Sequence, residues 1–374
     1  MTTAAPVQPL PLVGVGVVSS AGYGLTPLAA APAPRSAPTG VGEPDAAYPP
    51  RPVRPVAGFA VADHLGRRGT KNLDRLAGLS LVACKQALEA TGAVVGASEP
   101  DRTGVVLATN TGSIAGYSDL LYDTLTLEKP YLINPGKFAG SVMNCSAGQM
   151  AIRHGLKGLN ATVAGGRSAS LYAFRHARLA MTAGRAETLL VGGTEELSAP
   201  AAWAWHHAGT LRAGAPVGEG SAVFVVEAEE SADRPPLAEL LACEVGYHGW
   251  AGTRRRPPGR RGLANALATT IARALERSGV RPEEPATVSL GATGHIGLDR
   301  LEERAVRLAL GGRTPEQVRV SEVLGETYSA SGALQLAALL AHWRSTPADA
   351  PRTGLVTSVG HDGNAGALVV RERG

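Results

Sequence analysis

The chain has 374 residues, of which 44% are hydrophobic and 18% charged, as in an ordinary soluble globular protein with a large core. Its 36 basic and 32 acidic residues leave a net charge of +4, too small a surplus to indicate nucleic-acid binding. No apolar run reaches the roughly 18 residues that span a bilayer, the start lacks the charged region of a secretory signal, and three cysteines lie far apart. We therefore expect a cytoplasmic protein without a membrane segment, a metal or a cofactor.

The first part of the chain predicts buried strands and one amphipathic helix. Residues 10–20 (LPLVGVGVVSS) and 101–112 (DRTGVVLATNTG) are apolar runs that end in turn residues, which is typical of buried strands. Residues 72–91 have the apolar spacing of a helix, with Cys84 beside the apolar face as a small core residue. Residues 25–57 are rich in alanine and proline and predict a surface loop with little regular structure.

A segment near the middle of the chain predicts a βαβ unit. A short β-branched run, 161–164, is followed by two glycines, a helix-period segment over 167–184 and a second apolar run, 188–191. This order implies two parallel strands covered by a helix. The first residue after the glycines would lie at a helix N-terminus, where the dipole favours an anion and lowers the pKa of a thiol. That residue is Arg167, a cation, which suits neither a helix start nor a nucleophile.

Several histidines and one cysteine need a choice between a structural and a chemical role. Asn144 precedes a helical run and predicts its cap, and Cys145 follows as either a packing residue or an activated thiolate, of which we favour the first. We expect His154 to be partly buried rather than a base. The pair His206 and His207 has no third ligand at a suitable spacing, so we predict no metal site.

The second part of the chain begins with a proline-containing crossover near 232–237. Residues 252–262 (GTRRRPPGRRG) form a basic run broken by prolines, which predicts a loop. A helix is expected over 264–278 and a strand over 286–290.

Taken together, these segments resemble the β-ketoacyl synthases, the condensing enzymes of the thiolase fold. Gly155, Gly158 and Asn160 match the family's Gly-x-x-Gly-Pro-Asn motif, and the glycine pair after the second strand continues as the matching Gly-Gly-Thr-Glu. Further matches are the opening strand (family pattern ITGxGxVSPxG), 216–227 (GFVxGEGAAxLVLE) and 357–370 (SFGFGGxNA). The resemblance implies an α/β thiolase fold with a duplicated αβαβα five-layer architecture. Residues 1–233 and 234–374 would be its N-terminal and C-terminal ketosynthase-like halves.

The resemblance also locates the family's catalytic positions, and each is changed. The nucleophilic cysteine falls on Arg167. The motif VNAHGTGTxxxD resembles VSLGATGHIGLD, and its histidine falls on Gly291. The motif KSxxGHxxGAAGAL resembles SEVLGETYSASGAL, with Ser321 at the lysine and Glu326 at the histidine. In the closing loop, His361 stands at the gating phenylalanine.

We expect these substitutions to compensate one another. An unpaired arginine at a helix N-terminus would be costly, so Arg167 and Glu326 should form a buried ion pair in the former site, within about 6 Å of each other. Glu302 is the next partner to consider. His295 falls at a family threonine and is not expected to replace the missing base.

The resemblance therefore implies a non-condensing subunit of the chain length factor type. Such a subunit pairs with an active ketosynthase as a heterodimer in type II polyketide or fatty-acid-like biosynthesis and helps to shape the chain tunnel. Chain length factors usually carry glutamine at the cysteine position, so Arg167 departs from their pattern. The basic run is either a solvated loop or a docking patch for an acidic acyl carrier protein, formed by Arg254, Arg255, Arg256, Arg260 and Arg261.

Two alternatives stay open at this point. A residual malonyl decarboxylase or acyltransferase using Ser168, Ser170 or Cys145 would need a general base within hydrogen-bond reach, and the sequence shows none. A non-catalytic scaffold protein of the same fold would form no stable complex with a ketosynthase.

Overall fold

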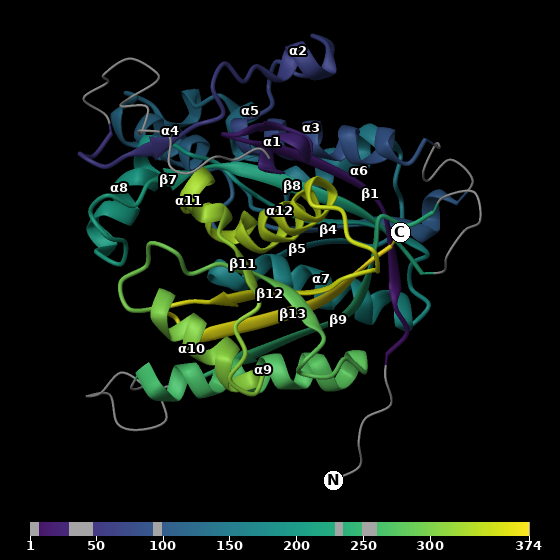
Figure 1. Ribbon diagram of the computed structural model, residues 1–374. Helices are drawn as coiled ribbons and strands as arrows, with labels where there is room; N and C mark the ends of the chain where they lie inside the picture. The colour runs from purple at the N-terminus through teal and green to yellow at the C-terminus, as the bar shows by residue number, and fades with distance from the viewer. Residues whose placement is uncertain (1–6, 30–47, 93–98, 229–234, 249–259, 374) are drawn as a thin grey trace.

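The computed structural model describes residues 7–29, 48–92, 99–228, 235–248 and 260–373 (Figure 1). Its strands are β1 (Leu10–Ser19), β2 (Gly22–Tyr23), β3 (Val53–Arg54), β4 (Thr103–Ala108), β5 (Asn160–Val163), β6 (Thr188–Glu195), β7 (Val217–Gly218), β8 (Gly220–Glu227), β9 (Ala238–Tyr247), β10 (Pro285–Leu290), β11 (Glu316–Val318), β12 (Thr353–Val359) and β13 (Asn364–Glu372). Its α-helices are α1 (Thr26–Ala29), α2 (Val61–Leu65), α3 (Arg75–Ala90), α4 (Ile114–Thr126), α5 (Pro135–Gly140), α6 (Cys145–His154), α7 (Ala169–Thr182), α8 (Ala199–Ala208), α9 (Arg260–Ser278), α10 (Asp299–Ala309), α11 (Val320–Leu324) and α12 (Ser331–Ser345). None of these helices is long and apolar enough to cross a membrane.

The strand order is the same in the two parts of the chain. Strands of the first part lie in the order β5-β4-β6-β8-β1, and those of the second part in the order β11-β10-β12-β13-β9. In both, the three outer strands are parallel and the remaining pairings are antiparallel. The two sets join where β1 pairs antiparallel with β9. The predicted boundary between residues 233 and 234 lies outside the described residues and stays a prediction, which this repeat supports.

Helices and strands form five layers, as expected for the thiolase fold. One apolar cluster joins α7 and α12 to strands from both parts of the chain, so these two helices lie between the two sets of strands (Figure 1). A second cluster packs α3 and α6 on the outer face of the first set, and a third packs α9 and α10 on the outer face of the second. The predicted αβαβα architecture is confirmed.

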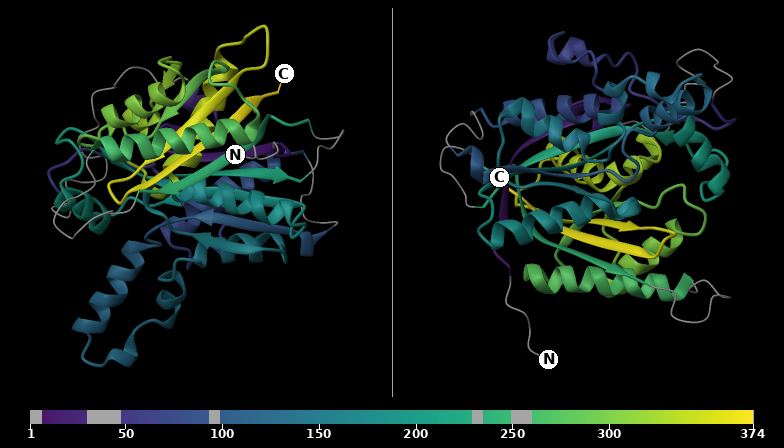
Figure 2. Two further views of the ribbon diagram at one scale, coloured as in Figure 1. Left: turned by 90° about the horizontal axis from the view of Figure 1, so that it is seen from below. Right: turned by 180° about the vertical axis from the view of Figure 1, so that it is seen from behind.

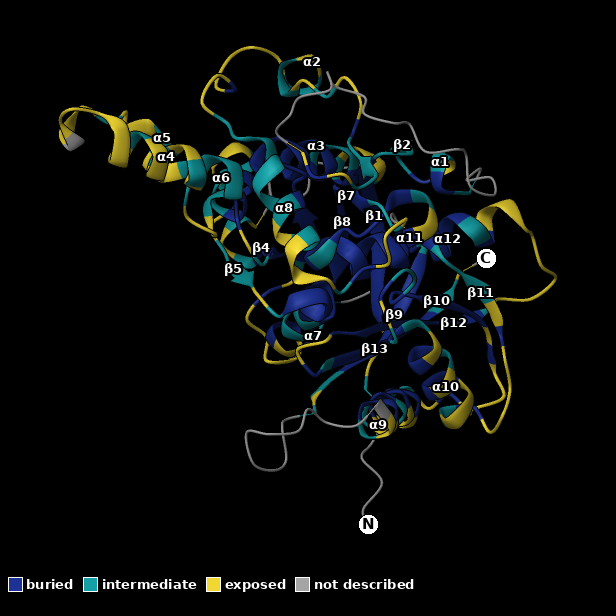
Figure 3. Ribbon diagram, turned by 90° about the vertical axis from the view of Figure 1, so that its left-hand side faces the viewer, coloured by how far each residue is buried: buried dark blue, intermediate teal, exposed yellow. Residues whose placement is uncertain are grey.

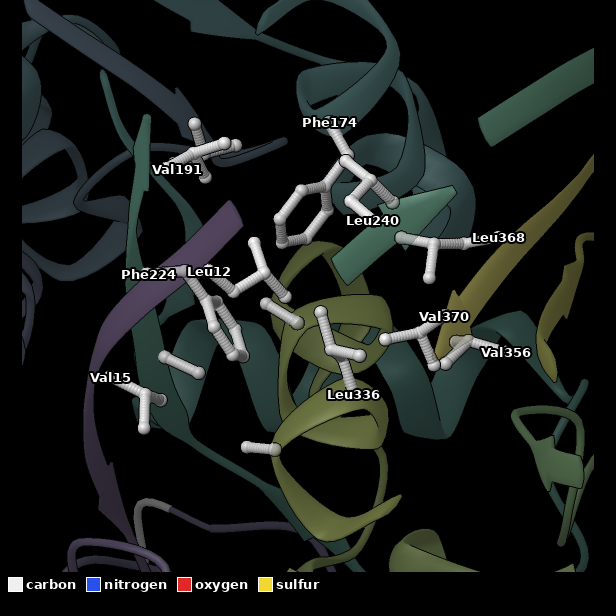
Figure 4. Close-up of a cluster of buried hydrophobic side chains, with 14 of the residues drawn as sticks. Leu12, Val15, Phe174, Val191, Phe224, Leu240, Leu336, Val356, Leu368 and Val370 are labelled. Atoms are coloured by element: carbon white, nitrogen blue, oxygen red, sulfur yellow. The ribbon is translucent and has the colours of Figure 1, made fainter. Parts of the chain in front are cut away.

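The central layer forms the core of the molecule. Phe174 on α7 and Leu336 on α12 pack among inward-facing strand residues such as Phe224, Leu240 and Val356 (Figure 4). All five side chains are fully buried. A buried leucine or phenylalanine stabilises a fold by about 1.5–3 kcal/mol, so this shared core holds the two sets of strands together.

Several predicted elements need correction. The strands of the βαβ unit, β5 and β6, do not pair with each other, because both pair in parallel with β4, which lies between them. The crossover helix α7 carries the chain past one intervening strand, which spacing in the sequence does not reveal. Residues 25–57 contain the short elements α1 and β3, and α9 begins at Arg260 within the predicted basic loop. Asn144 precedes α6, but its side chain makes no capping bond.

Candidate functional site

Arg167 is positioned by a tight turn between β5 and α7. It lies in the short 3₁₀ turn Gly166–Ser168, and Gly166 has a φ of +58°, a conformation that favours glycine. α7 itself starts at Ala169, so Arg167 precedes the helix rather than opening it. The turn directs the Arg167 side chain into the interior, where it is only 3% exposed.

The structure brings Arg167 and Glu326 together. The Arg167 Nε lies 3.1 Å from the Glu326 Oε2, and one terminal guanidinium nitrogen lies 3.0 Å from the same oxygen. The guanidinium also donates to the carbonyl of Val359 at 3.0 Å and to the carbonyl of Gly291. The buried cation is therefore neutralised by one carboxylate and satisfied by two strand-end carbonyls, as a buried ion pair requires.

His295 completes this cluster. Its Nε2 lies 2.6 Å from the Glu326 Oε2, and its side chain is fully buried. The second Glu326 oxygen accepts the backbone N–H of Tyr328 at 2.7 Å. The sequence assigned His295 no place in the site, because its matching motif position is a threonine. Its contact with Glu326 depends on the fold, since the two residues lie on separate loops.

The electrostatics of the cluster favour an ionised Glu326. Burial alone would raise the pKa of this carboxyl group, but the Arg167 charge and the His295 contact outweigh burial and hold its pKa at about 2. Burial lowers the pKa of His295, and Arg167 lowers it further. A neutral His295 donates its Nε2–H to Glu326, while its Nδ1 has no hydrogen-bond partner among the described residues.

The other altered positions are filled without supplying catalytic groups. A Cβ on Gly291 would lie 2.9 Å and 3.0 Å from the amide atoms of Gln335, so a side chain there requires Gln335 to move. Ser321 is buried, with its Oγ 3.4 Å from the Gly291 carbonyl. Glu302 does not contact Arg167. It accepts the N–H groups of Gly291 and Ala292 at 3.1 Å and 2.7 Å and so fixes the turn after β10.

The alternative nucleophiles lack an activating base. Ser168 donates to the hydroxyl of Ser358 at 3.0 Å, and Ser170 donates to the carbonyl of Ser329. Cys145 is half-buried, and its pKa is raised by burial and by Asp74. A raised pKa makes this thiol less reactive, in agreement with a packing role.

Two further glutamates, which the sequence did not single out as site residues, lie beside the cluster. Glu195 and Glu196 are buried at the end of β6. Burial raises the pKa of both, to about 7 for Glu196, which accepts the backbone N–H of Ala115 at 2.8 Å. In the sequence, only Glu195, the last residue of the Gly-Gly-Thr-Glu match, drew attention to this part of the chain. Tyr328 lies beside these two glutamates and is the one described non-glycine residue with a positive φ (44°). No motif in the sequence indicated it.

The remaining predicted residues lie outside the cluster. His361 is exposed, with its ring centre 5.6 Å from that of His295. Arg254, Arg255 and Arg256 fall outside the described residues, whereas Arg260 and Arg261 open α9. His154 is partly buried, as expected. His206 and His207 end α8, and no group of potential metal ligands occurs in the described part of the chain.

An exposed arm projects from the body of the molecule next to this site. It consists of residues 114–140, from α4 to α5, and Figure 2 shows it extending away from the layers. Neither helix contains a buried residue. Large apolar side chains are exposed along the arm (Figure 3): Tyr117, Leu121, Tyr122, Leu125, Leu127, Tyr131, Leu132 and Phe138. A surface of this kind marks an interaction site.

Comparisons with known proteins agree with this architecture. A family model described as "Beta-ketoacyl synthase, N-terminal domain" matches residues 59–232. A putative polyketide beta-ketoacyl synthase 2 from Streptomyces virginiae is 29% identical and covers 98% of this chain and 99% of its own length. The chloroplastic 3-oxoacyl-[acyl-carrier-protein] synthase I of Hordeum vulgare is 25% identical over 78% of this chain and 68% of its own length.

Among solved structures, the ishigamide ketosynthase/chain length factor superposes with a TM-score of 0.82. It is 33% identical and covers 98% of this chain and all of its own. Motifs, layers, strand order and full-length similarity coincide, and the chain belongs to the β-ketoacyl synthase family.

Proposed function

We propose that this chain is a non-condensing subunit of the chain length factor type. It would pair with an active ketosynthase in type II polyketide or fatty-acid-like biosynthesis and shape the tunnel that holds the growing chain. The observation that carries this proposal is the buried Arg167–Glu326–His295 cluster. Arg167 and Glu326 are the residues at which the resemblance predicts the family's nucleophile and one of its histidines.

The chemistry of condensation explains why this cluster matters. A ketosynthase needs a thiolate to accept the acyl chain and histidines that assist decarboxylation and stabilise the enolate. Arg167 cannot form an acyl adduct, because its guanidinium stays protonated and its hydrogen bonds are already made. Glu326 is ionised, so it would repel an enolate instead of stabilising it.

The arm supports pairing with another subunit. Its exposed tyrosines and leucines are unfavourable in water, and burying them against a partner would stabilise a complex. One full-length relative in the comparisons is a ketosynthase/chain length factor, which favours a ketosynthase as the partner. An acyl carrier protein would then deliver substrate to that partner.

Intact-protein mass spectrometry tests this function. The purified chain is incubated with acyl-loaded and malonyl-loaded carrier protein, with and without a co-expressed ketosynthase whose Cys-His-His set is intact. We expect adducts on the ketosynthase alone and co-elution of the two subunits in size-exclusion chromatography. A stoichiometric adduct on this chain, mapped to Cys145 or Ser168, would instead make it an acyltransferase. Absence of any complex would favour a scaffold protein.

A further inference from the structure

The arm joins the rest of the chain at two connections, which together form its root. Residues 109–113 lead from β4 into α4, and residues 141–144 lead from α5 into α6. Gly112 has a φ of +64°, the left-handed conformation that favours glycine. A Cβ at Gly112 would lie 3.2 Å from the Cα of Met143, so the two connections pass close to each other. The contacts made at this root therefore help to determine how firmly α4 is held.

One carboxyl group holds the start of α4. The Glu196 Oε1 accepts the backbone N–H of Ala115 at 2.8 Å, and its Oε2 accepts the hydroxyl of Ser113 at 3.2 Å. The Ser113 Oγ in turn accepts the backbone N–H of Gly116 at 3.2 Å. Because Glu196 directly follows β6, it links the end of a buried strand to the first turn of the arm.

A second carboxyl group lies at the other connection. Asp74 caps α3 by accepting the backbone N–H of Ala77 at 2.7 Å. A Cβ on Gly140, where α5 ends, would lie 3.1 Å from the Asp74 Oδ2. The charge of Asp74 also acts on Glu196. The two carboxylates, one at each connection, therefore repel each other when both are ionised.

The other charged groups nearest to Glu196 do not offset this repulsion. Glu195, the preceding residue, is buried as well, and its Oε1 accepts the hydroxyl of Thr111 at 2.5 Å. Arg75, at the start of α3, is the cation on which the Glu196 charge acts. Its guanidinium, however, already donates to both carboxylate oxygens of Glu219, at 2.8 Å and 2.5 Å. The first turn of α4 contains no acidic residue.

Solvent can exchange protons with Glu196 through a cavity of about 250 Å³ between α8 and the root of the arm. The cavity opens along α8, where Ala204 and Ala208 are exposed. The two histidines that end α8 do not line it. Apart from Glu196, its titratable lining residues are Glu195, Glu326 and Tyr328. The Glu326 charge is paired with Arg167, so it adds little repulsion.

We propose that the root of the arm is a pH-responsive hinge, in which a neutral Glu196 holds α4 to the body and an ionised Glu196 lets the root open. A protonated carboxyl group keeps both contacts, because its carbonyl oxygen accepts the Ala115 N–H and its O–H donates to the Ser113 hydroxyl. Ionisation places another buried charge beside Asp74 and Glu195, and opening relieves that cost by exposing the carboxylate to water. The inference concerns the chain by itself and does not depend on the proposed function.

The direction of the pH response follows from proton linkage. Burial is the largest cause that raises the pKa of Glu196 to about 7, and Asp74 and Glu195 raise it further. In an opened root this glutamate is exposed and returns towards its ordinary pKa of 4.5. The closed root therefore holds the proton more tightly, and opening becomes easier as the pH rises. From pH 6 to pH 8 the opening equilibrium should increase roughly tenfold.

Hydrogen exchange of the purified chain, followed by mass spectrometry between pH 6 and pH 8, tests the hinge. Dividing the exchange rate of a peptide covering 109–117 by its rate in the unfolded chain gives the opening equilibrium. We expect the roughly tenfold increase in the parent. Glu196→Gln keeps both contacts through its amide and cannot ionise, so its opening should not change with pH. Strand β8 is the internal reference for global unfolding, and 109–117 should open more often than β8 at every pH.

A second variant tests the repulsion between the two connections. Asp74→Asn preserves a capping side chain on α3 but removes the charge, so the increase in opening should be clearly smaller than in the parent. No increase in the parent, or an equal increase in Glu196→Gln, would overturn the role of Glu196. An equal increase in Asp74→Asn would overturn the repulsion. Opening of 109–117 no more often than β8 would show that the root opens only when the whole chain unfolds, which would overturn the hinge.

Discussion

The buried cluster and the arm both depart from the usual distribution of residues. Charged side chains are buried in the cluster, and large apolar side chains are exposed in the arm. At the centre, a cation, an anion and a histidine are almost fully buried, yet the two charges are paired with each other within the chain. In the arm, tyrosines and leucines are exposed, and neither of the helices that carry most of them contains a buried residue. The charges of the centre are paired within one chain, whereas the exposed apolar side chains of the arm carry a free-energy cost in water that a partner would remove. On the proposed function, the contrast separates what the subunit would have lost, its chemistry, from what it would have kept, a surface for assembly.

The largest effect is expected from breaking the buried ion pair. Glu326→Ala leaves Arg167 buried and unpaired, which should lower the free energy of unfolding by about 3–5 kcal/mol in urea denaturation. Glu322→Ala, on the exposed side of α11, is the matched control and should change it by less than about 0.5 kcal/mol. Arg167→Met/Glu326→Leu should be more stable than Glu326→Ala. Equal stability of Glu326→Ala and the control would show that the pair contributes nothing.

The second-largest effect on stability is expected from the titration of Glu196, which lies between the buried cluster and the root of the arm. Burial raises its pKa from 4.5 to about 7, so the folded state holds this proton more tightly than the unfolded state. The stability that protonation contributes is complete below pH 4.5 and is lost as the pH rises through 7. Glu196→Gln should therefore be more stable than the parent at pH 8 by on the order of 3 kcal/mol.

That difference should disappear near pH 4.5, and thermal unfolding across the range measures it. Glu276→Gln, a substitution of an exposed carboxylate on α9, serves as the control and should not change the pH profile. A Glu196→Gln profile parallel to that of the parent would contradict the prediction.

A smaller effect is expected from substitutions in the arm, which should weaken assembly with a partner without changing the folding of the chain. Tyr122→Ser/Leu125→Ser removes two of the most exposed apolar side chains of the arm, at 68% and 82% exposure. Affinity for a co-expressed ketosynthase with an intact Cys-His-His set should fall by about thirtyfold, or about 2 kcal/mol, while the stability of the isolated chain stays the same. Leu179→Ser/Leu308→Ser, at exposed positions outside the arm, is the control for loss of apolar surface. Equal binding by both variants would remove the arm from the interface.

The smallest effect concerns chemistry. Arg167→Cys restores the family's nucleophile, but Gly291 and Glu326 still stand where histidines belong, and Gln335 obstructs a side chain at 291. We expect no condensation product in an assay with loaded carrier protein. Formation of product by this single variant would mean that the lost nucleophile alone silences the subunit.

The sequence alone determined the family and the fold, and it predicted the positions at which the family's catalytic residues are changed. The motif matches are spread over the chain and reflect local requirements for glycines, strands and turns. These requirements are met even in segments where the catalytic residue type is changed. The opposite charges at positions 167 and 326 also indicated a pair before any geometry was known, because a buried charge needs a counter-charge.

Tertiary structure alone decided which other residues share that centre. The contact of His295 with Glu326 depends on how two loops from the second part of the chain converge. The position of β4 between β5 and β6 depends on the order of strands in the sheet, which the spacing of residues in the sequence does not indicate. The same holds for the cavity below α8 and for the exposure of the arm, because an amphipathic pattern does not specify whether its apolar face meets the same chain or another one.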